Sequence, residues 1–152
     1  MRSLFLSVLF IPTMLSPSQP KVDLTQRVVE EKVIVEKRPI EPLVNALITV
    51  ESQGNPHAIG DTHLDAPSIG LLQIRPIMVR EVNRILKLKG ADHKYKLSDR
   101  KDSIKSVEMF YIWYEFHHKD DDFETIARSW NGGSNGPKLK ATVHYWNKVK
   151  VE

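Results

Sequence analysis

The chain has 152 residues, of which 41% are hydrophobic and 27% are charged, a size and balance that suit one compact domain with a short extension. Its 22 Lys and Arg against 19 Asp and Glu give a net charge of +3, which is too weak to indicate a nucleic-acid partner. The sequence contains no cysteine, which excludes disulfides, cysteine nucleophiles and thiolate metal sites.

The first 20 residues differ in composition from the rest of the chain. Residues 1–20 carry one Arg, no acidic residue and an apolar run from Leu4 to Leu15, which is typical of a secretory signal. The run is shorter than the about 20 apolar residues that span a bilayer. No small-x-small cleavage site follows, so we expect either a signal peptide or an N-terminal membrane anchor. Both alternatives predict an exported, periplasmic or cell-envelope protein, or a virion-associated one if the source is a phage.

The next segment, residues 21–39, is charged and rich in valine and shows no helical stripe, so we interpret it as a linker. Pro39 and Pro42 mark the entry to the first expected helix, because proline is tolerated in a first turn, where its missing N–H has no partner anyway. We therefore expect one domain over residues 40–152, mainly α-helical with little or no β-structure.

Apolar periodicity and helix-ending residues predict five helices in this domain. They are expected at residues 41–53, from 76 to 90, from 98 or 99 to about 118, from 121 to the sequence NGG, and from 137 onward. Residues 54–75 form a long connection between the first two helices.

Three of these helices carry further expectations. The helix that ends at His118 is apolar on nearly all sides, which is typical of a buried central helix. The next helix is expected to begin with Asp121 and Glu124 as a capping pair. In the last helix, the side chains expected to face the core are those of Leu139, Val143 and Trp146.

An acidic residue interrupts the apolar stripe of the first helix. Val44, Leu47 and Ile48 lie at i, i+3 and i+4, and the next position of the stripe, i+7, is Glu51. A carboxyl group on an apolar face is desolvated, and desolvation favours the neutral form and raises the pKa. Glu51 is therefore expected to keep its proton near neutral pH, as a general acid must.

Alternatively, the helix has already reached the surface at Glu51, and the carboxylate is solvated. The sequence that follows favours a functional site instead. Residues 54–75 form a connection without clear secondary structure, and long connections in compact domains are often functional. The connection contains the apolar segment SIGLLQI, in which Gln73 is the polar residue.

Three segments in this order, ESQGNPHA, SIGLLQI and ARSWNGG, resemble the signature of the lytic transglycosylase branch of the lysozyme superfamily. That signature pairs Glu-Ser at a helix end with Gly-Leu-x-Gln further along the chain, followed by an Ala-x-x-Tyr-Asn-x-Gly segment. The resemblance covers about residues 40–149 and implies a lysozyme-like fold with a catalytic cleft.

The resemblance implies a peptidoglycan lytic transglycosylase, which cleaves the β-1,4 bond between N-acetylmuramic acid and N-acetylglucosamine in glycan strands. Glu51 would protonate the glycosidic oxygen and then act as base on the muramyl 6-hydroxyl, which closes a 1,6-anhydro ring. We expect no cofactor, and we expect no metal because the spacing of His57, Asp61 and His63 fits no zinc pattern. The implied substrate-binding residues are Ser52, Gly70, Leu71, Gln73, Trp130 and Asn131.

Some of these residues have an expected role by the same resemblance. Ser52 would lie close to Glu51 as a hydrogen-bond partner. Gly70 would let the backbone approach the sugar, and Gln73 would bind an N-acetyl group. Trp130 departs from the family's tyrosine, because an indole offers only an N–H donor. It can stack on a sugar ring, or it can simply pack in the core.

Two alternatives to a transglycosylase stay open. In the first, Asp61 or Asp65 activates a water, as in a goose-type lysozyme, and the protein is a hydrolytic muramidase. Its two carboxyl groups would then lie about 6.5–9.5 Å apart. In the second, the domain binds glycan without cleaving it, as a component of a virion or a secretion apparatus. The intact Glu51 argues against this second alternative.

Overall fold

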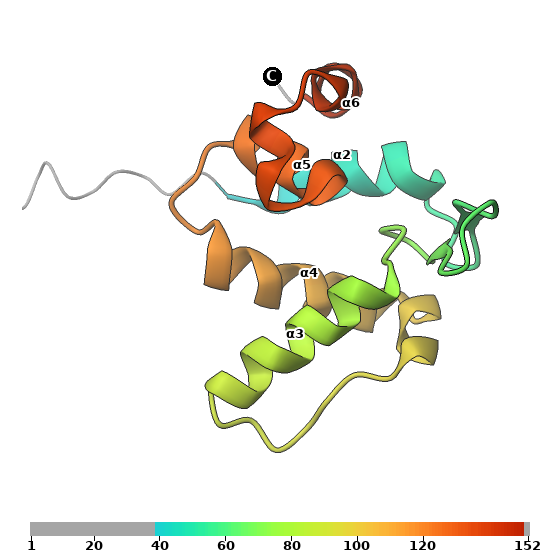
Figure 1. Ribbon diagram of the computed structural model, residues 1–152, viewed down its shortest axis with the longest axis vertical. Helices are drawn as coiled ribbons and strands as arrows, with labels where there is room; N and C mark the ends of the chain where they lie inside the picture. Colours follow the sequence, from blue (N-terminus) through green and yellow to red (C-terminus); the bar gives the residue numbers. More distant parts are fainter. Residues whose placement is uncertain (1–38, 151–152) are drawn as a thin grey trace, which may run out of the picture. The chain divides into compact units, whose positions relative to one another are not determined.

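α-Helices make up most of residues 39–150, the part of the chain that the computed structural model describes (Figure 1). The five α-helices of this part are α2 (Glu41–Ser52), α3 (Pro76–Leu88), α4 (Ser103–His117), α5 (Phe123–Gly132) and α6 (Ala141–Val149). Two short 3-10 helices accompany them, η1 (Leu97–Lys101) before α4 and η2 (Gly133–Lys138) after α5. The expectation of a mainly α-helical domain is confirmed.

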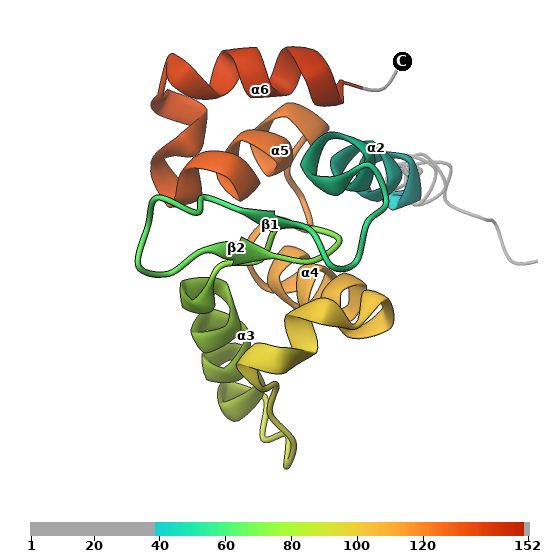
Figure 2. The same ribbon diagram turned by 90° about the vertical axis from the view of Figure 1, so that its right-hand side faces the viewer.

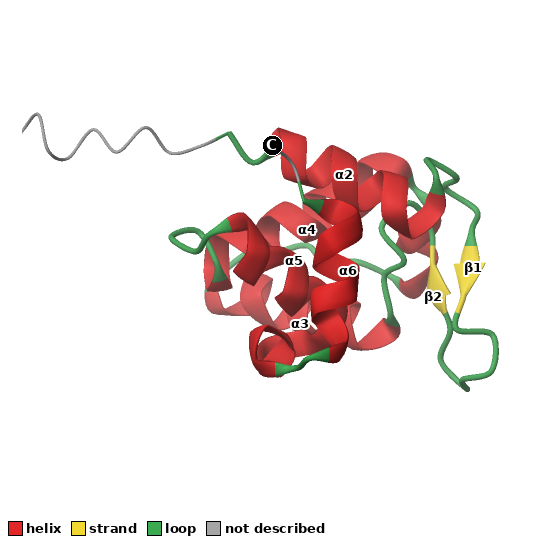
Figure 3. Ribbon diagram, turned by 90° about the horizontal axis from the view of Figure 1, so that it is seen from above, coloured by secondary structure: helices red, strands yellow, loops and turns green. Residues whose placement is uncertain are grey.

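The β-structure of the described residues is one small antiparallel hairpin in the connection between α2 and α3. Strand β1 (Ile59–Gly60) pairs with β2 (Ser68–Ile69), with Ile59 opposite Ile69 and Gly60 opposite Ser68. The hairpin lies at one edge of the helical body (Figure 3). It therefore forms a wall beside the helices rather than a layer of the core.

Helix α4 supplies large side chains to the centre of the core. Met109 and Phe110 are fully buried, and the Phe110 ring contacts the rings of Trp113 and Trp130 at centroid distances of 5.8 and 5.1 Å. The expected burial of this helix is confirmed for that face. Its first turn differs, because Ile104 is 73% exposed.

The starts of two helices differ from the sequence expectation. Helix α4 begins at Ser103 because the side chain of Asp102 accepts hydrogen bonds from two backbone N–H groups of the first turn, and the preceding residues form η1. Helix α5 is capped by Asp122 instead of Asp121, and its carboxylate accepts a 2.7 Å hydrogen bond from the Thr125 N–H. The predicted capping pair was therefore one residue early.

The last helix also begins later than expected, because Pro137 lies inside η2 and α6 starts at Ala141. The expectation that Leu139 and Val143 face the core is wrong, since they are 45% and 40% exposed. The expectation is confirmed for Trp146, which packs against the core. Because the helix starts later, the other side chains on this face are those of Thr142, Tyr145 and Val149.

A buried arginine ties the hairpin to the helical body. The Arg100 guanidinium donates hydrogen bonds of 3.1 Å to the carbonyl oxygens of Pro67 and Ile74, on either side of β2. Gly70 has a φ of +85°, and a Cβ atom at this position would overlap the Arg100 carbonyl oxygen. Gly70 is thus required by its backbone conformation and by the close approach of η1.

The predicted signal or anchor at residues 1–20 and nearly all of the predicted linker at 21–39 lie outside the described residues. Among residues 39–150, no helix combines the length and the apolar character that a membrane crossing needs.

Candidate active site

Glu51 lies in the last turn of α2, beside the hairpin. Helix α2 ends here because Gln53 adopts a left-handed conformation, with a φ of 53°. Helix α6 approaches from the other side and brings Tyr145, whose hydroxyl donates a 2.6 Å hydrogen bond to Glu51 Oε1. Two side chains 94 positions apart in sequence therefore meet at this carboxyl group.

Burial raises the pKa of Glu51 from 4.5 to about 7. Desolvation is the largest cause, because the charged form loses hydration in the folded protein. The hydrogen bond from Tyr145 lowers the pKa, and the negative charge of Asp61 raises it, each by less than burial does. The expectation of a raised pKa at this stripe position is confirmed, and near neutral pH Glu51 exists in both protonation states.

The hydrogen bond from Tyr145 also fixes which carboxyl oxygen carries the proton. Burial and the charge of Glu51 raise the pKa of Tyr145, so its hydroxyl stays protonated and remains a donor. Because Oε1 accepts this hydrogen bond, the acidic proton of neutral Glu51 belongs on Oε2. Oε2 is then the atom from which a proton can be transferred.

Glu51 opens into a cleft of about 850 Å³. The hairpin lies between α5 and α6 on one side and α3 and α4 on the other (Figure 2), and each of these elements except α6 contributes to the cleft lining. Polar and aromatic side chains line the cleft, among them Asp61, Gln73, Trp113, His118, Trp130 and Asn131. Such a lining suits a sugar chain, whose hydroxyl groups form hydrogen bonds and whose C–H faces contact aromatic rings.

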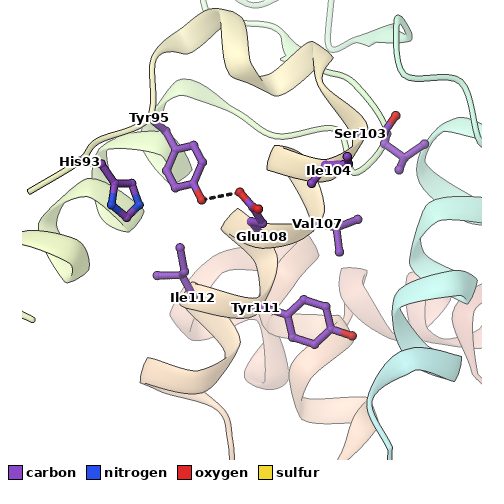
Figure 4. Close-up of a pocket in the computed structure, with 9 residues that line it drawn as sticks. His93, Tyr95, Ser103, Ile104, Val107, Glu108, Tyr111 and Ile112 are labelled. Atoms are coloured by element: carbon purple, nitrogen blue, oxygen red, sulfur yellow. Dashed lines mark hydrogen bonds between the residues drawn. The ribbon is translucent and has the colours of Figure 1, made fainter. Parts of the chain in front are cut away.

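A second cavity, of about 840 Å³, lies along α4 (Figure 4). Apolar side chains such as those of Ile104, Val107 and Ile112 dominate its lining. The Tyr95 hydroxyl donates a 2.9 Å hydrogen bond to Glu108 there, but Glu108 is exposed to solvent. The buried acid that general acid catalysis needs is in the cleft, so the cleft is the candidate active site.

A family model for the transglycosylase SLT domain matches residues 31–145. The chain belongs to this family. Membership supports a glycan-cleaving role of the lytic transglycosylase or lysozyme kind, with peptidoglycan as the substrate class.

Solved structures support the fold of this SLT domain. One match is the crystal structure of Aeromonas hydrophila PliI in complex with Meretrix lusoria lysozyme, with 20% identity, a TM-score of 0.58, and coverage of 72% of this chain and 86% of that chain. The crystal structure of inhibitor-bound lysozyme from Meretrix lusoria matches with a TM-score of 0.57 and the same identity and coverage. The fold is lysozyme-like. No curated protein sequence matches the chain.

The structure brings together five of the residues proposed from the sequence. The cleft is lined by Glu51, Asp61, Gln73, Trp130 and Asn131. The other proposed residues do not line it: Ser52, Asp65, Gly70 and Leu71.

Ser52 and Leu71 lie outside the cleft lining and are bonded to each other. The Ser52 hydroxyl donates a 2.7 Å hydrogen bond to the Leu71 carbonyl oxygen, which ties the end of α2 to the connection after β2. The Leu71 side chain lines the second cavity instead of the cleft. The hydrogen-bond partner expected for Glu51 was Ser52, and the structure gives Tyr145 in its place.

The side-chain amide of Gln73 forms three hydrogen bonds with other groups of the protein. Its Nε2 donates to the carbonyl oxygens of Ala58 at 3.2 Å and Gly70 at 2.9 Å, and its Oε1 accepts a 2.8 Å hydrogen bond from Ser68. An amide oxygen accepts two hydrogen bonds, so Oε1 retains one site for a substrate N–H. Gln73 therefore shapes the hairpin and keeps one acceptor site for the proposed contact with an N-acetyl group.

Trp130 packs on the core and also lines the cleft, so stacking of its ring on a sugar stays a prediction. Its ring centroid lies 5.1 Å from those of Phe110 and Trp113, so the side chain packs on the core. The same half-buried ring lines the cleft. Asn131, the next residue, is exposed at the rim of the cleft.

The two aspartates of the connection differ in position. Asp61 adopts a φ of 51°, lines the cleft and acts on the pKa of Glu51 through its charge, whereas Asp65 lies outside the lining. A hydrolytic role would therefore fall to Asp61. In the described part of the chain, no group of three His, Cys, Asp or Glu side chains is placed to hold a metal ion.

Sequence reasoning missed two features of the site. Tyr145 was overlooked because the last helix was started too early, although Thr142, Tyr145, Trp146 and Val149 follow the i, i+3, i+4, i+7 spacing. The second feature is the pair of histidines at the end of α4, His117 and His118, which both line the cleft. No local pattern marks them, because the packing of other segments around α4 forms the cleft.

Proposed function

We propose that this SLT domain is a peptidoglycan lytic transglycosylase that cleaves the bond between N-acetylmuramic acid and N-acetylglucosamine with Glu51 as acid and base. The observation that carries the proposal is the state of Glu51. Its carboxyl group has a pKa of about 7, opens into a polar cleft, and is oriented through Oε1 by Tyr145. A group poised near neutral pH can serve as acid and as base in one reaction cycle.

In the first step, the proton on Glu51 Oε2 passes to the glycosidic oxygen while the bond from this oxygen to the muramyl C1 breaks. The leaving sugar departs with a hydroxyl group, and positive charge develops at C1. The newly formed Glu51 carboxylate and the carboxylate of Asp61, which both line the cleft, stabilise this charge. The hydrogen bond from Tyr145 stabilises the carboxylate at the same moment.

In the second step, Glu51 takes the proton of the muramyl 6-hydroxyl, and the oxygen of this hydroxyl forms a bond to C1. The product is a 1,6-anhydro ring, no water is consumed, and Glu51 is protonated again for the next cycle. One carboxyl group, that of Glu51, is therefore sufficient for both proton transfers.

A second candidate is hydrolysis, and the position of Asp61 favours it as the alternative. Asp61 lines the cleft and is close enough to Glu51 for its charge to raise the pKa of that carboxyl. In a hydrolase, the Asp61 carboxylate would activate a water that attacks C1, and Glu51 would still supply the proton to the leaving oxygen.

The substrate suggests where the protein works. Peptidoglycan lies outside the cytoplasmic membrane, so the proposed reaction needs the export that residues 1–20 are expected to direct. Fractionation of cells that produce the full chain tests this. The envelope fraction should contain the protein, and a chain that begins at Lys21 should stay in the cytoplasm. Recovery of both chains from the cytoplasm would contradict it.

Mass spectrometry of fragments released from purified sacculi tests the reaction. Anhydro-muramyl ends are the expected product, and they lack one water relative to reducing ends. Reducing ends would indicate the hydrolytic alternative. Binding to sacculi without any release would indicate a protein that holds glycan and does not cleave it.

A further inference from the structure

His118, the residue that follows α4, is fixed on two sides. Its Nδ1 lies 2.7 Å from Asp121 Oδ2, and its ring centroid lies 4.4 Å from that of Trp113. Only 13% of its side chain is exposed. Because Asp121 is a carboxylate, it accepts a hydrogen bond from the Nδ1–H, which sets both the tautomer and the direction of the ring.

The other ring nitrogen, Nε2, differs from Nδ1 because no protein group of the described residues is bonded to it. His118 lines the cleft, and no hydrogen bond to Nε2 is formed by the described residues. In the same part of the chain, every buried side-chain nitrogen or oxygen has a hydrogen-bond partner. Nε2 has none, so it is reachable by solvent and by a ligand.

The neighbouring His117, at the same helix end, differs from His118 because its Nε2 has a protein partner. Its Nε2 lies 2.7 Å from Glu81 Oε1, and Glu81 also accepts two hydrogen bonds from Arg84. His117, Glu81 and Arg84 therefore satisfy one another. In His118, by contrast, Nδ1 is bonded to Asp121, and Nε2 has no hydrogen-bond partner among the described residues.

Two helix ends that lie apart in the domain both contribute to the cleft lining. Helix α2 ends beside the hairpin, whereas α4 ends on the opposite side of the domain (Figure 1). Glu51 and His118 line the same cleft from these two ends. A glycan strand whose bond is held at Glu51 can therefore reach His118 with a sugar unit further along.

We propose that His118 is a sugar-binding residue at the end of the cleft away from Glu51, where Nε2 holds a hydroxyl or N-acetyl group of the strand. This inference rests on the proposed function, because it takes a glycan strand as the substrate. Nε2 accepts a hydrogen bond when the imidazole is neutral and donates one when it is charged. A sugar hydroxyl can match either state. Asp121 is a positioning residue that acts through His118.

Two substitutions separate sugar binding from a structural role. In His118→Asn, the amide takes the place of Nδ1, so the contact with Asp121 is kept and the group that faces the cleft is lost. In His118→Gln, the longer side chain places an amide near the position of Nε2, so the group that faces the cleft is kept. His144→Ala is the matched control, because His144 is exposed on α6 and lies outside the cleft.

The experiment compares the full-length variants on soluble glycan strands of graded length, by KM for cleavage and by equilibrium binding. We expect His118→Asn to raise KM and Kd for long strands about threefold to tenfold, the loss of one hydrogen bond. It should leave values for the shortest cleavable strand unchanged, and His118→Gln should lose less. A larger loss in His118→Gln, an equal loss at all lengths, or no change would overturn the proposal.

Asp121→Ala keeps the test decisive if the His118 variants unfold, because the Asp121 side chain is 40% exposed. It should raise KM and Kd for long strands only, and unchanged values would overturn the proposal. The binding measurement also separates this inference from the proposed function. If the wild-type protein binds long strands through His118 but cleaves none, the proposed function fails and the sugar-binding role stands.

Discussion

A tyrosine donates a hydrogen bond to a glutamate in each of the two cavities, and only one of these two glutamates is a candidate catalytic group. Tyr145 donates to Glu51 at 2.6 Å in the cleft, and Tyr95 donates to Glu108 at 2.9 Å in the apolar cavity along α4. The geometry of the two pairs is similar. Their surroundings differ, because Glu51 is half-buried and Glu108 is exposed.

The difference shows that burial, and not the hydrogen bond, creates the acid. The hydrogen bond from Tyr145 lowers the pKa of Glu51, yet desolvation outweighs it and raises the pKa from 4.5 to about 7. Such a change corresponds to about 3 kcal/mol between the two protonation states. This energy comes from the position of Glu51 on the apolar stripe of α2, so the feature that stands out in the sequence also supplies the chemistry.

The largest expected effect is that of Glu51→Gln, which keeps the shape of the side chain and removes the transferable proton. We expect the release of fragments from sacculi to fall by at least about a hundredfold, the range that general acid–base catalysis contributes. The fold should stay intact. The matched control is Glu108→Gln, which should leave the release unchanged. Similar losses in both variants would show that burial does not distinguish the two pairs.

The pH dependence of stability should differ between the wild type and Glu51→Gln. Between about pH 5 and about pH 8, the unfolded chain loses the Glu51 proton first, because its pKa is lower, so the wild type becomes less stable as the pH rises. The decline amounts to at most about 3 kcal/mol, and Glu51→Gln lacks it. Denaturant unfolding at several pH values should therefore show that the advantage of the variant grows with pH. An advantage that is constant over this range would contradict the raised pKa.

Replacing the donor tyrosines should have a smaller effect on activity and a distinct effect on its pH profile. Tyr145→Phe removes a hydrogen bond that stabilises the Glu51 carboxylate, so we expect about a tenfold loss of cleavage. The same hydrogen bond lowers the pKa of Glu51, so the alkaline limb of the rate profile should move to higher pH. Tyr95→Phe is the control and should change neither. A shift to lower pH in Tyr145→Phe would mean that the hydrogen bond acts in the opposite sense.

The smallest expected effect is that of Asp61→Asn. The charge of Asp61 raises the pKa of Glu51, so its removal should move the alkaline limb of the profile to lower pH. Cleavage should fall by about threefold, as for a nearby charge that takes no part in proton transfer. Complete loss of cleavage would instead assign Asp61 the water-activating role of a hydrolase.

The part of the site that follows from helix periodicity could be predicted from the sequence. A period of 3.6 residues places Glu51 on the buried face with Val44 and Leu47, so its desolvation was predictable from α2 alone. The contact of Tyr145 with Glu51 could not be predicted, because the direction of the Tyr145 side chain depends on where α6 starts. Pro137 was read as the first residue of a helix, and it lies in η2 instead.

The residues of the connection show a different limit. The resemblance implied that Gly70 lets the backbone approach the sugar, whereas the element that comes close to Gly70 in the structure is η1. A Cβ on Gly70 would meet Arg100, which lies 30 positions later in η1 and whose role depends on tertiary packing. His118 is a similar case, since its relation to the cleft arises from elements that meet only in the folded protein.

The most direct test is to titrate the Glu51 side-chain carboxyl group by carbon NMR in the full chain, with Glu51→Gln to assign its signal. We expect a midpoint at about 7, well above the ordinary value of 4.5. In Tyr145→Phe the midpoint should be higher still, because the hydrogen bond that lowers the pKa is gone. A midpoint near 4.5 in the wild type would contradict the claim that burial makes Glu51 the acid.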